Sequence, residues 1–99
     1  MKAKIWNKRF WVRETDPSVL ESNFERILLE SGFCIVGKIS KTFSPHGFTC
    51  VFLLSESHLA IHTFPEEEKT YIELASCNEK YFTEFKKQIK KLGIVIKNN

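Results

Sequence analysis

Apolar residues recur at helical spacing in two segments of this chain. In residues 15–32, Asp16 can cap a helix and Gly32 suits its end. The apolar face of this segment comprises Leu20, Phe24, Ile27, Leu28 and the small Ser31. A second segment follows the capping residue Asn78 and stops at Gly93. Its inner stripe comprises Phe82, Phe85, Ile89 and Leu92. The pattern therefore predicts two amphipathic helices.

Other apolar segments alternate with period two or run nearly continuously, as strands do. They span residues 4–14, 33–43, 48–55, 58–64, 70–76 and 94–97. Short connections join most successive strands, so we expect a mainly antiparallel sheet. Two helices must then cover one face of the sheet. The prediction is an α+β fold, a two-layer α/β sandwich, in a single domain of residues 1–99.

The chain has 99 residues and a net charge of +3. Its lysines gather in residues 86–93, which we interpret as the solvated face of the second helix. No aromatic residue interleaves on that face, so we expect no nucleic-acid partner. No segment approaches the ~20 apolar residues that span a bilayer, and the basic start lacks the apolar core of a signal peptide. These features predict a cytoplasmic protein without a membrane partner.

The three cysteines are an odd number and show no C-x-x-C spacing. A disulfide framework or a metal site such as zinc is therefore not expected. Cys34 and Cys50 lie inside apolar runs and are predicted to be small core residues. Cys77 stands at the junction between a strand and the second helix.

The stretch "LSESHLAIHTFPE", Leu54 to Glu66, carries the candidate chemistry. It places hydroxyl, carboxylate and imidazole groups within four residues, and side-chain alternation puts His58 and His62 on one strand face. One interpretation is a polar turn with solvated histidines. A serine hydrolase is a second, but no G-x-S-x-G is present. In a third, the hydroxyl of Ser57 attacks its own preceding peptide bond, which cuts the chain and builds a cofactor from the backbone.

From Phe43 to Cys77 the chain resembles the prokaryotic-type S-adenosylmethionine decarboxylase proenzymes. The motif Glu-Ser-His followed by Ile-His-Thr-x-Pro-Glu carries the resemblance, as does the spacing of twenty residues from Ser57 to Cys77. It implies self-processing at Glu56–Ser57 into chains 1–56 and 57–99, with Ser57 becoming a pyruvoyl group. The enzyme would form a Schiff base with S-adenosylmethionine and decarboxylate it for polyamine (spermidine) synthesis.

The resemblance also implies roles for single residues. His62 would assist processing as a base, Thr49 stands where the family usually has a serine that donates to the tetrahedral intermediate, and Cys77 would be the proton donor in catalysis. Phe43 would stack on adenine and Glu66 would bind the ribose hydroxyls, and Phe64 is also expected to contact the substrate. The family's active site is shared between subunits, and the small core also favours association, so we expect a homodimer.

Several positions depart from the family pattern. The usual tryptophan before Pro-Glu is Phe64, a usual histidine is Lys41, the usual glycine after the cysteine is Asn78, and an acid is replaced by Arg13. An added cation near the pocket would disfavour a sulfonium substrate. A pyruvoyl-dependent decarboxylase of a basic amino acid, ornithine or arginine, is therefore the alternative. A catalytically silent regulatory homologue is a third reading, against which the intact Ser57, His62 and Cys77 argue.

Overall fold

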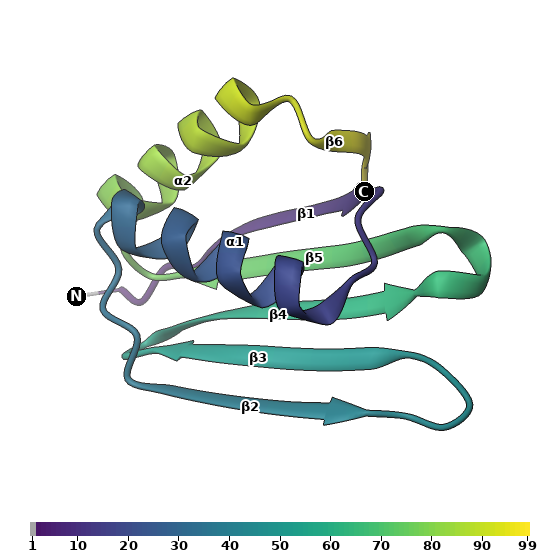
Figure 1. Cartoon of the computed structure of the whole chain (residues 1–99). Coiled ribbons are helices and arrows are strands. Elements are labelled where there is room, and N and C mark those ends of the chain that lie inside the picture. The colour runs from purple at the N-terminus through teal and green to yellow at the C-terminus, as the bar shows by residue number, and fades with distance from the viewer. Residues whose placement is uncertain (1) are drawn as a thin grey trace.

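The computed structural model describes residues 2–99, which form six strands and two α-helices (Figure 1). The strands are β1 (Trp6–Val12), β2 (Gly37–Thr42), β3 (Phe48–Leu54), β4 (Ser57–Phe64), β5 (Lys69–Ser76) and β6 (Val95–Asn98). The helices are α1 (Pro17–Ser31) and α2 (Glu79–Leu92), and a short 3₁₀ helix, η1 (Pro65–Glu67), connects β4 to β5.

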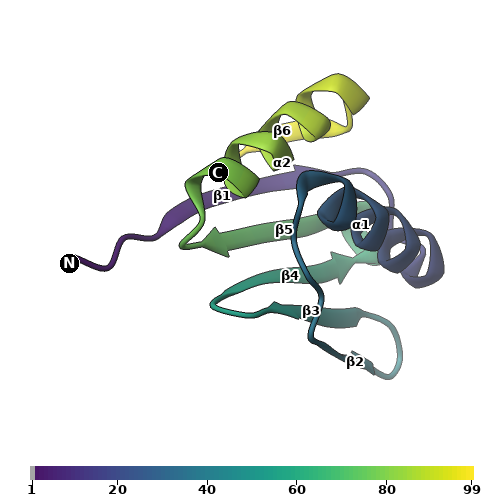
Figure 2. The ribbon, with the colours of Figure 1, turned by 90° about the vertical axis from the view of Figure 1, so that its left-hand side faces the viewer.

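One sheet contains all six strands in the order β2-β3-β4-β5-β1-β6. Every neighbouring pair is antiparallel. Both helices lie on the same face of this sheet, and the opposite face carries no helix (Figures 1 and 2). The predicted two-layer α+β sandwich is confirmed.

Both helices begin and end at the expected residues. The Asp16 carboxylate accepts hydrogen bonds from the backbone N–H groups of Ser18 and Val19, and the Asn78 side chain accepts one from Tyr81 N–H. Gly32, at φ 109°, ends α1 in the left-handed conformation that glycine adopts without strain. The five predicted inward residues of α1 are its buried residues. Leu92 of α2 was predicted wrongly as a buried residue, because it borders the open cavity beside α1 and β6 and is 42% exposed.

The hydrophobic core lies between the helices and the sheet. Its fully buried large side chains include Phe10, Phe24, Phe52, Phe85, Leu59, Ile61, Ile72 and Leu74. Cys50 belongs to this core, as predicted, whereas Cys34 is exposed. Cys34 lies in the crossing from α1 to the sheet, where Phe33 takes the inward position. For the same reason the second strand begins at Gly37 rather than at Phe33.

The hairpin between β3 and β4 turns one residue earlier than expected. Ser57 is already the first residue of β4 and pairs with Leu54 of β3. The connection is therefore only Ser55 and Glu56, and Ser55 adopts a φ of 63°. Two-residue hairpins require such left-handed backbone, which costs a serine more than a glycine. The Glu56–Ser57 peptide bond thus lies where a strained turn meets a well-paired strand.

Candidate active site

Ser57 lies on the helix-facing side of β4 and is only 4% exposed. Its Oγ is 3.0 Å from Ser76 Oγ, and the backbone N–H of Cys77 points at it from 3.4 Å. The β4–β5 register pairs His58 with Ala75, so Ser57 and Ser76 are the next cross-strand neighbours. The register of two strands therefore places Ser57, the expected nucleophile, beside the end of β5.

Cys77 completes this group. Its thiol donates to the Glu56 carboxylate at 3.4 Å from Oε2, although the two residues are 21 positions apart. A cavity of about 390 Å³, formed by the end of α1, the β3–β4 turn and the start of α2, is lined by Glu56, Ser57 and Cys77. We call Glu56, Ser57, Ser76 and Cys77 the processing cluster. Sequence analysis missed Ser76, whose one signal was its place directly before Cys77 at the end of a strand.

His62 and Thr49 lie on the opposite, open face of the sheet. The two residues pair directly across β3 and β4, and Thr49 Oγ1 is 3.0 Å from His62 Nδ1. Side chains alternate along a strand, so the odd step from Ser57 to His62 reverses the face. Five residues at ~3.3 Å each also separate their Cα atoms by about 17 Å. Within one chain, His62 does not reach Ser57.

His62 belongs to a row of side chains that crosses the open face. Strand register aligns Lys41, Thr49, His62, Tyr71 and Trp11 across five strands. The His62 and Tyr71 rings stack with centroids 6.3 Å apart, and Trp11 lies 5.2 Å from Tyr71. These contacts create a half-buried aromatic surface without a covering layer.

Two further contacts extend this surface. Phe64 packs on Trp11 with ring centroids 5.7 Å apart, and Lys69 Nζ lies 4.5 Å above the Trp11 ring. Tyr71 donates its hydroxyl to Glu73 at 2.7 Å. Burial, and then the neighbouring Glu73 carboxylate, raise the pKa of Tyr71. We call Thr49, His62, Phe64, Tyr71 and Trp11 the open-face cluster.

The expected substrate-binding residues lie at the far edge of the sheet. Phe43 is 47% exposed in the loop after β2, and Glu66 lies in η1, where its Oε2 is 2.7 Å from His46 Nε2. Strands β2 and β4 both run antiparallel to β3, so their carboxyl ends lie at the same end of the sheet, which we call its far edge. Ser57 begins β4 at the other edge, about 25 Å away at ~3.3 Å per residue.

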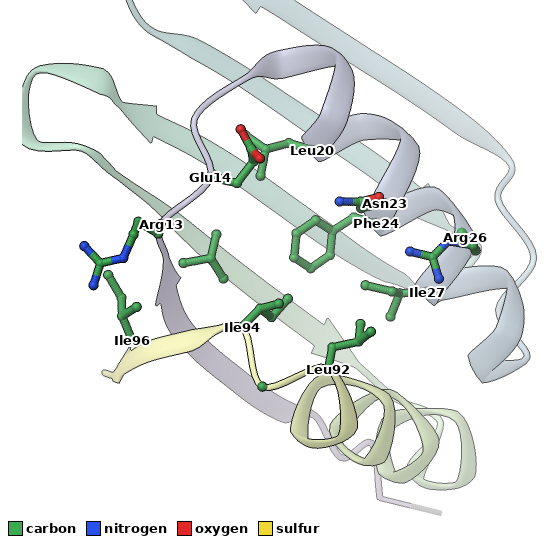
Figure 3. Close-up of a pocket in the computed structure, with 12 residues that line it drawn as sticks. Arg13, Glu14, Leu20, Asn23, Phe24, Arg26, Ile27, Leu92, Ile94 and Ile96 are labelled. Atoms are coloured by element: carbon green, nitrogen blue, oxygen red, sulfur yellow. The ribbon is translucent and has the colours of Figure 1, made fainter.

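A second cavity, of about 310 Å³, opens between α1 and β6 (Figure 3). Figure 3 shows Phe24, Ile27, Leu92 and Ile94 around it, with the Arg13 guanidinium directed away from them. Arg13 follows β1 at the edge where Val12 pairs with Thr70, whereas Ser76 pairs with Trp6 at the other edge. The added cation therefore does not lie beside the processing cluster of its own chain.

Within residues 2–99, no three His, Cys, Asp or Glu side chains come close enough to hold a metal ion. Neither helix in this part of the chain is long and apolar enough to cross a membrane.

The fold and the site define an α+β protein with one bare sheet face and a buried serine that follows a strained turn beside a cysteine. Sequence comparison extends this description. The profile of the family described as S-adenosylmethionine decarboxylase matches residues 13–93. The chain belongs to the S-adenosylmethionine decarboxylase family.

Individual relatives agree with this assignment. The chain is similar to "S-adenosylmethionine decarboxylase proenzyme 2" of Bacillus cereus, with 47% identity over 73 residues that cover 74% of this chain and 58% of the relative. It is also similar to the Thermotoga petrophila "S-adenosylmethionine decarboxylase proenzyme", with 38% identity over 77 residues that cover 73% and 59%. The chain thus spans less than two thirds of the length of these curated relatives.

A solved structure supports the fold independently. The crystal structure of the adenosylmethionine decarboxylase from Aquifex aeolicus superposes with a TM-score of 0.72 at 20% sequence identity. The match covers 95% of this chain and 84% of that structure. At this identity the likeness establishes a shared fold.

Proposed function

We propose that this chain is the proenzyme of a pyruvoyl-dependent S-adenosylmethionine decarboxylase that cuts itself between Glu56 and Ser57. The observation that carries the proposal is the processing cluster, in which the nucleophile, the bond it would attack and the expected proton donor meet at one cavity. Family membership supports the same activity.

The local backbone favours cleavage at this bond. In self-cleavage, Ser57 Oγ attacks the Glu56 carbonyl carbon, and the amide is exchanged for an ester. That exchange is uphill and needs a strained ground state. Ser55, directly before Glu56, holds a φ of 63°, and a residue in such a conformation stores about 1–3 kcal/mol. Release of the turn on cutting removes this strain.

The sheet topology keeps the two fragments together. Residues 1–56 contain β1, α1, β2 and β3, and residues 57–99 contain the remaining elements. In the sheet the fragments meet at three strand pairs, β3 with β4, β5 with β1, and β1 with β6. A cut after Glu56 therefore leaves every ladder intact.

The residues around position 57 fit a pyruvoyl group. The group would form the first residue of β4, inside the cavity and next to the Cys77 backbone N–H. When present, it supplies an electron sink for decarboxylation of an α-amino acid. Cys77, half-exposed in the same cavity, is placed to deliver a proton to the substrate, and its contact with the Glu56 carboxylate orients the thiol.

A complete site requires two copies of the chain. His62, Thr49, Phe43 and Glu66 lie away from Ser57 in one chain, on the open face or at the far edge. If two open faces pack about a two-fold axis with their strands reversed, the far edge of one copy covers the Ser57 edge of the other. Exposed apolar side chains of this face, Ile39 at 74% and Leu53 at 50%, would be buried there.

Intact mass and substrate turnover test this function. Purified protein should consist of fragments 1–56 and 57–99, and Ser57→Ala should remain a single chain. Cut protein should release labelled CO₂ from S-adenosylmethionine and not from ornithine or arginine. Wild-type protein that stays uncut after long incubation would refute self-processing, and release from a basic amino acid alone would refute the substrate. The product would serve polyamine synthesis.

A further inference from the structure

We infer that Ser76 is a positioning residue for self-cleavage, because its buried hydroxyl receives the hydrogen bond of the Ser57 nucleophile. The inference rests on the proposed function and adds a residue to it. None of the roles implied by the family pattern involves Ser76. The side chain is 0% exposed and lies at the end of β5, on the same sheet face as Ser57.

The hydrogen bonds of Ser76 leave its hydroxyl no freedom to turn. Its Oγ accepts from Ser57 Oγ–H at 3.0 Å and from Asn78 N–H at 3.0 Å, and its own proton goes to the Asn78 carbonyl at 3.3 Å. A serine hydroxyl has one proton to donate and two lone pairs to accept with. All three are in use, so the direction of the acceptor lone pair toward Ser57 is fixed.

A fixed acceptor fixes the nucleophile. Ser57 Oγ donates to Ser76 and accepts from Cys77 N–H at 3.4 Å. Both partners come from the β5–α2 junction, which the Asn78 cap holds by its bond to Tyr81 N–H. The Ser57 side chain is therefore restricted in χ1 before the reaction begins, and the attack loses less rotational entropy.

The chemistry of the shift shows why Ser76 positions rather than acts as a base. The bond from Ser57 Oγ to the Glu56 carbonyl carbon forms, the bond from that carbon to the Ser57 nitrogen breaks, and the hydroxyl proton ends on that nitrogen. Ser76 Oγ cannot keep the proton, because a neutral hydroxyl is a very weak base. As charge develops on Ser57 Oγ, the Cys77 N–H and the N-terminal end of the α2 dipole stabilise it.

The experiment compares hydroxyl deletions at two buried positions of β5. Ser76→Ala removes the acceptor, Ser76→Cys keeps the side-chain size with a weaker acceptor, and Ser76→Thr restores the hydroxyl. Thr70→Ala is the matched control. Thr70 is also 0% exposed on the same strand face, but its hydroxyl binds the Glu14 carbonyl at the far edge. Each variant is purified early, and cleavage is followed over time by intact mass.

We expect Ser76→Ala and Ser76→Cys to slow cleavage by about tenfold, as the loss of a neutral hydrogen bond that holds the Ser57 rotamer does. Ser76→Thr should recover most of the rate. Thr70→Ala should cut at the wild-type rate even where its melting temperature falls as far as that of Ser76→Ala. If Ser76→Ala does not fold, Ser76→Cys decides the matter.

Cleavage of Ser76→Ala or Ser76→Cys at the wild-type rate, or equal slowing in Thr70→Ala, overturns the role of Ser76 while the proposed function stands. A wild-type chain that never cuts overturns both. The wild-type sample of the same experiment therefore distinguishes failure of the Ser76 inference from failure of the proposed function.

Discussion

The division between the two faces of the sheet predicts that His62 assists cleavage of the other copy rather than of its own chain. In one chain the Cα atoms of His62 and Ser57 are about 17 Å apart and their side chains point to opposite faces. A general base must come within about 2.6–3.2 Å of the proton it takes, directly or through one water. No rotamer of His62 closes that gap, so any contribution of His62 to cleavage would have to come from a second copy.

The expected loss of cleavage rate follows from the contribution that a general base makes. A positioned acid or base contributes typically about 10²–10⁴-fold in rate. His62→Ala alone should therefore cut slower by that factor, although its own Ser57 is intact. Thr49 Oγ1, 3.0 Å from His62 Nδ1, loses its partner in the same variant, so some of the loss reflects a less well held Thr49 hydroxyl.

Co-expression of two inactive chains tests the arrangement. His62→Ala provides a cleavable Ser57 without the base, and Ser57→Ala provides the base without a cleavable serine. In mixed dimers the His62→Ala chain should be cut and the Ser57→Ala chain should stay whole, which their masses distinguish. A control pairs His62→Ala with a chain that carries both substitutions, and cutting there should be no faster than in His62→Ala alone.

Two results would contradict this reasoning. One is a His62→Ala chain that cuts by itself at the wild-type rate, because the base would then be another group. The other is a mixed dimer, demonstrated by differently tagged chains, in which neither chain is cut. That outcome would mean that the open face of the partner does not approach Ser57.

Three further predictions concern single residues. Cys77→Ala should still cut itself, because the acyl shift does not use the thiol, but CO₂ release from S-adenosylmethionine should fall by about 10²–10⁴-fold; normal turnover would exclude Cys77 as the proton donor. Burial, with help from Glu21, raises the pKa of Cys50 from 9.0 to about 12, so the unfolded state loses its thiol proton first and stability should fall as pH rises from about 9 toward 12. Thermal melts should show this loss in the wild type and a smaller one in Cys50→Val, and equal slopes would refute the linkage. Gly32→Ala should destabilise by about 1–3 kcal/mol in urea titrations, because a Cβ there would lie 2.7 Å from Tyr81 at a φ of 109°; Gly93→Ala, with φ 62° and open space, should cost less, and the reverse order would contradict the geometry.

Local patterns were sufficient to predict most of the fold. Two helices were predicted from their capping residues, Asp16 and Asn78, from the glycines at their ends and from apolar residues at helical spacing. Those signals depend only on nearby residues. The errors fall where tertiary position decides. Leu92 continues the helical stripe but borders an open cavity, and Cys34 continues an apolar run but lies in a crossing between layers.

The candidate site was predictable as a set of residues and not as an arrangement. Strand alternation alone implied that Ser57 and His62 face opposite ways, yet the family pattern assigns both to one reaction. Sequence spacing also could not reveal Ser76, because its neighbour Ser57 comes from another strand and their contact depends on the β4–β5 register. The functional roles themselves remain predictions that the experiments above address.

If the proposed function holds, the separation of the two clusters gives the unpaired sheet face a use. A second helix layer on the open face would bury Trp11 and Tyr71 and stabilise a single chain, but it would also cover His62 and Thr49. Leaving the face bare keeps these groups available to another copy. Under the proposed function, the same face would link assembly to maturation, because a chain without its partner would lack the base for the cut at Glu56–Ser57. A monomer would then stay an inert precursor, and the active group would form only where two copies complete the substrate site.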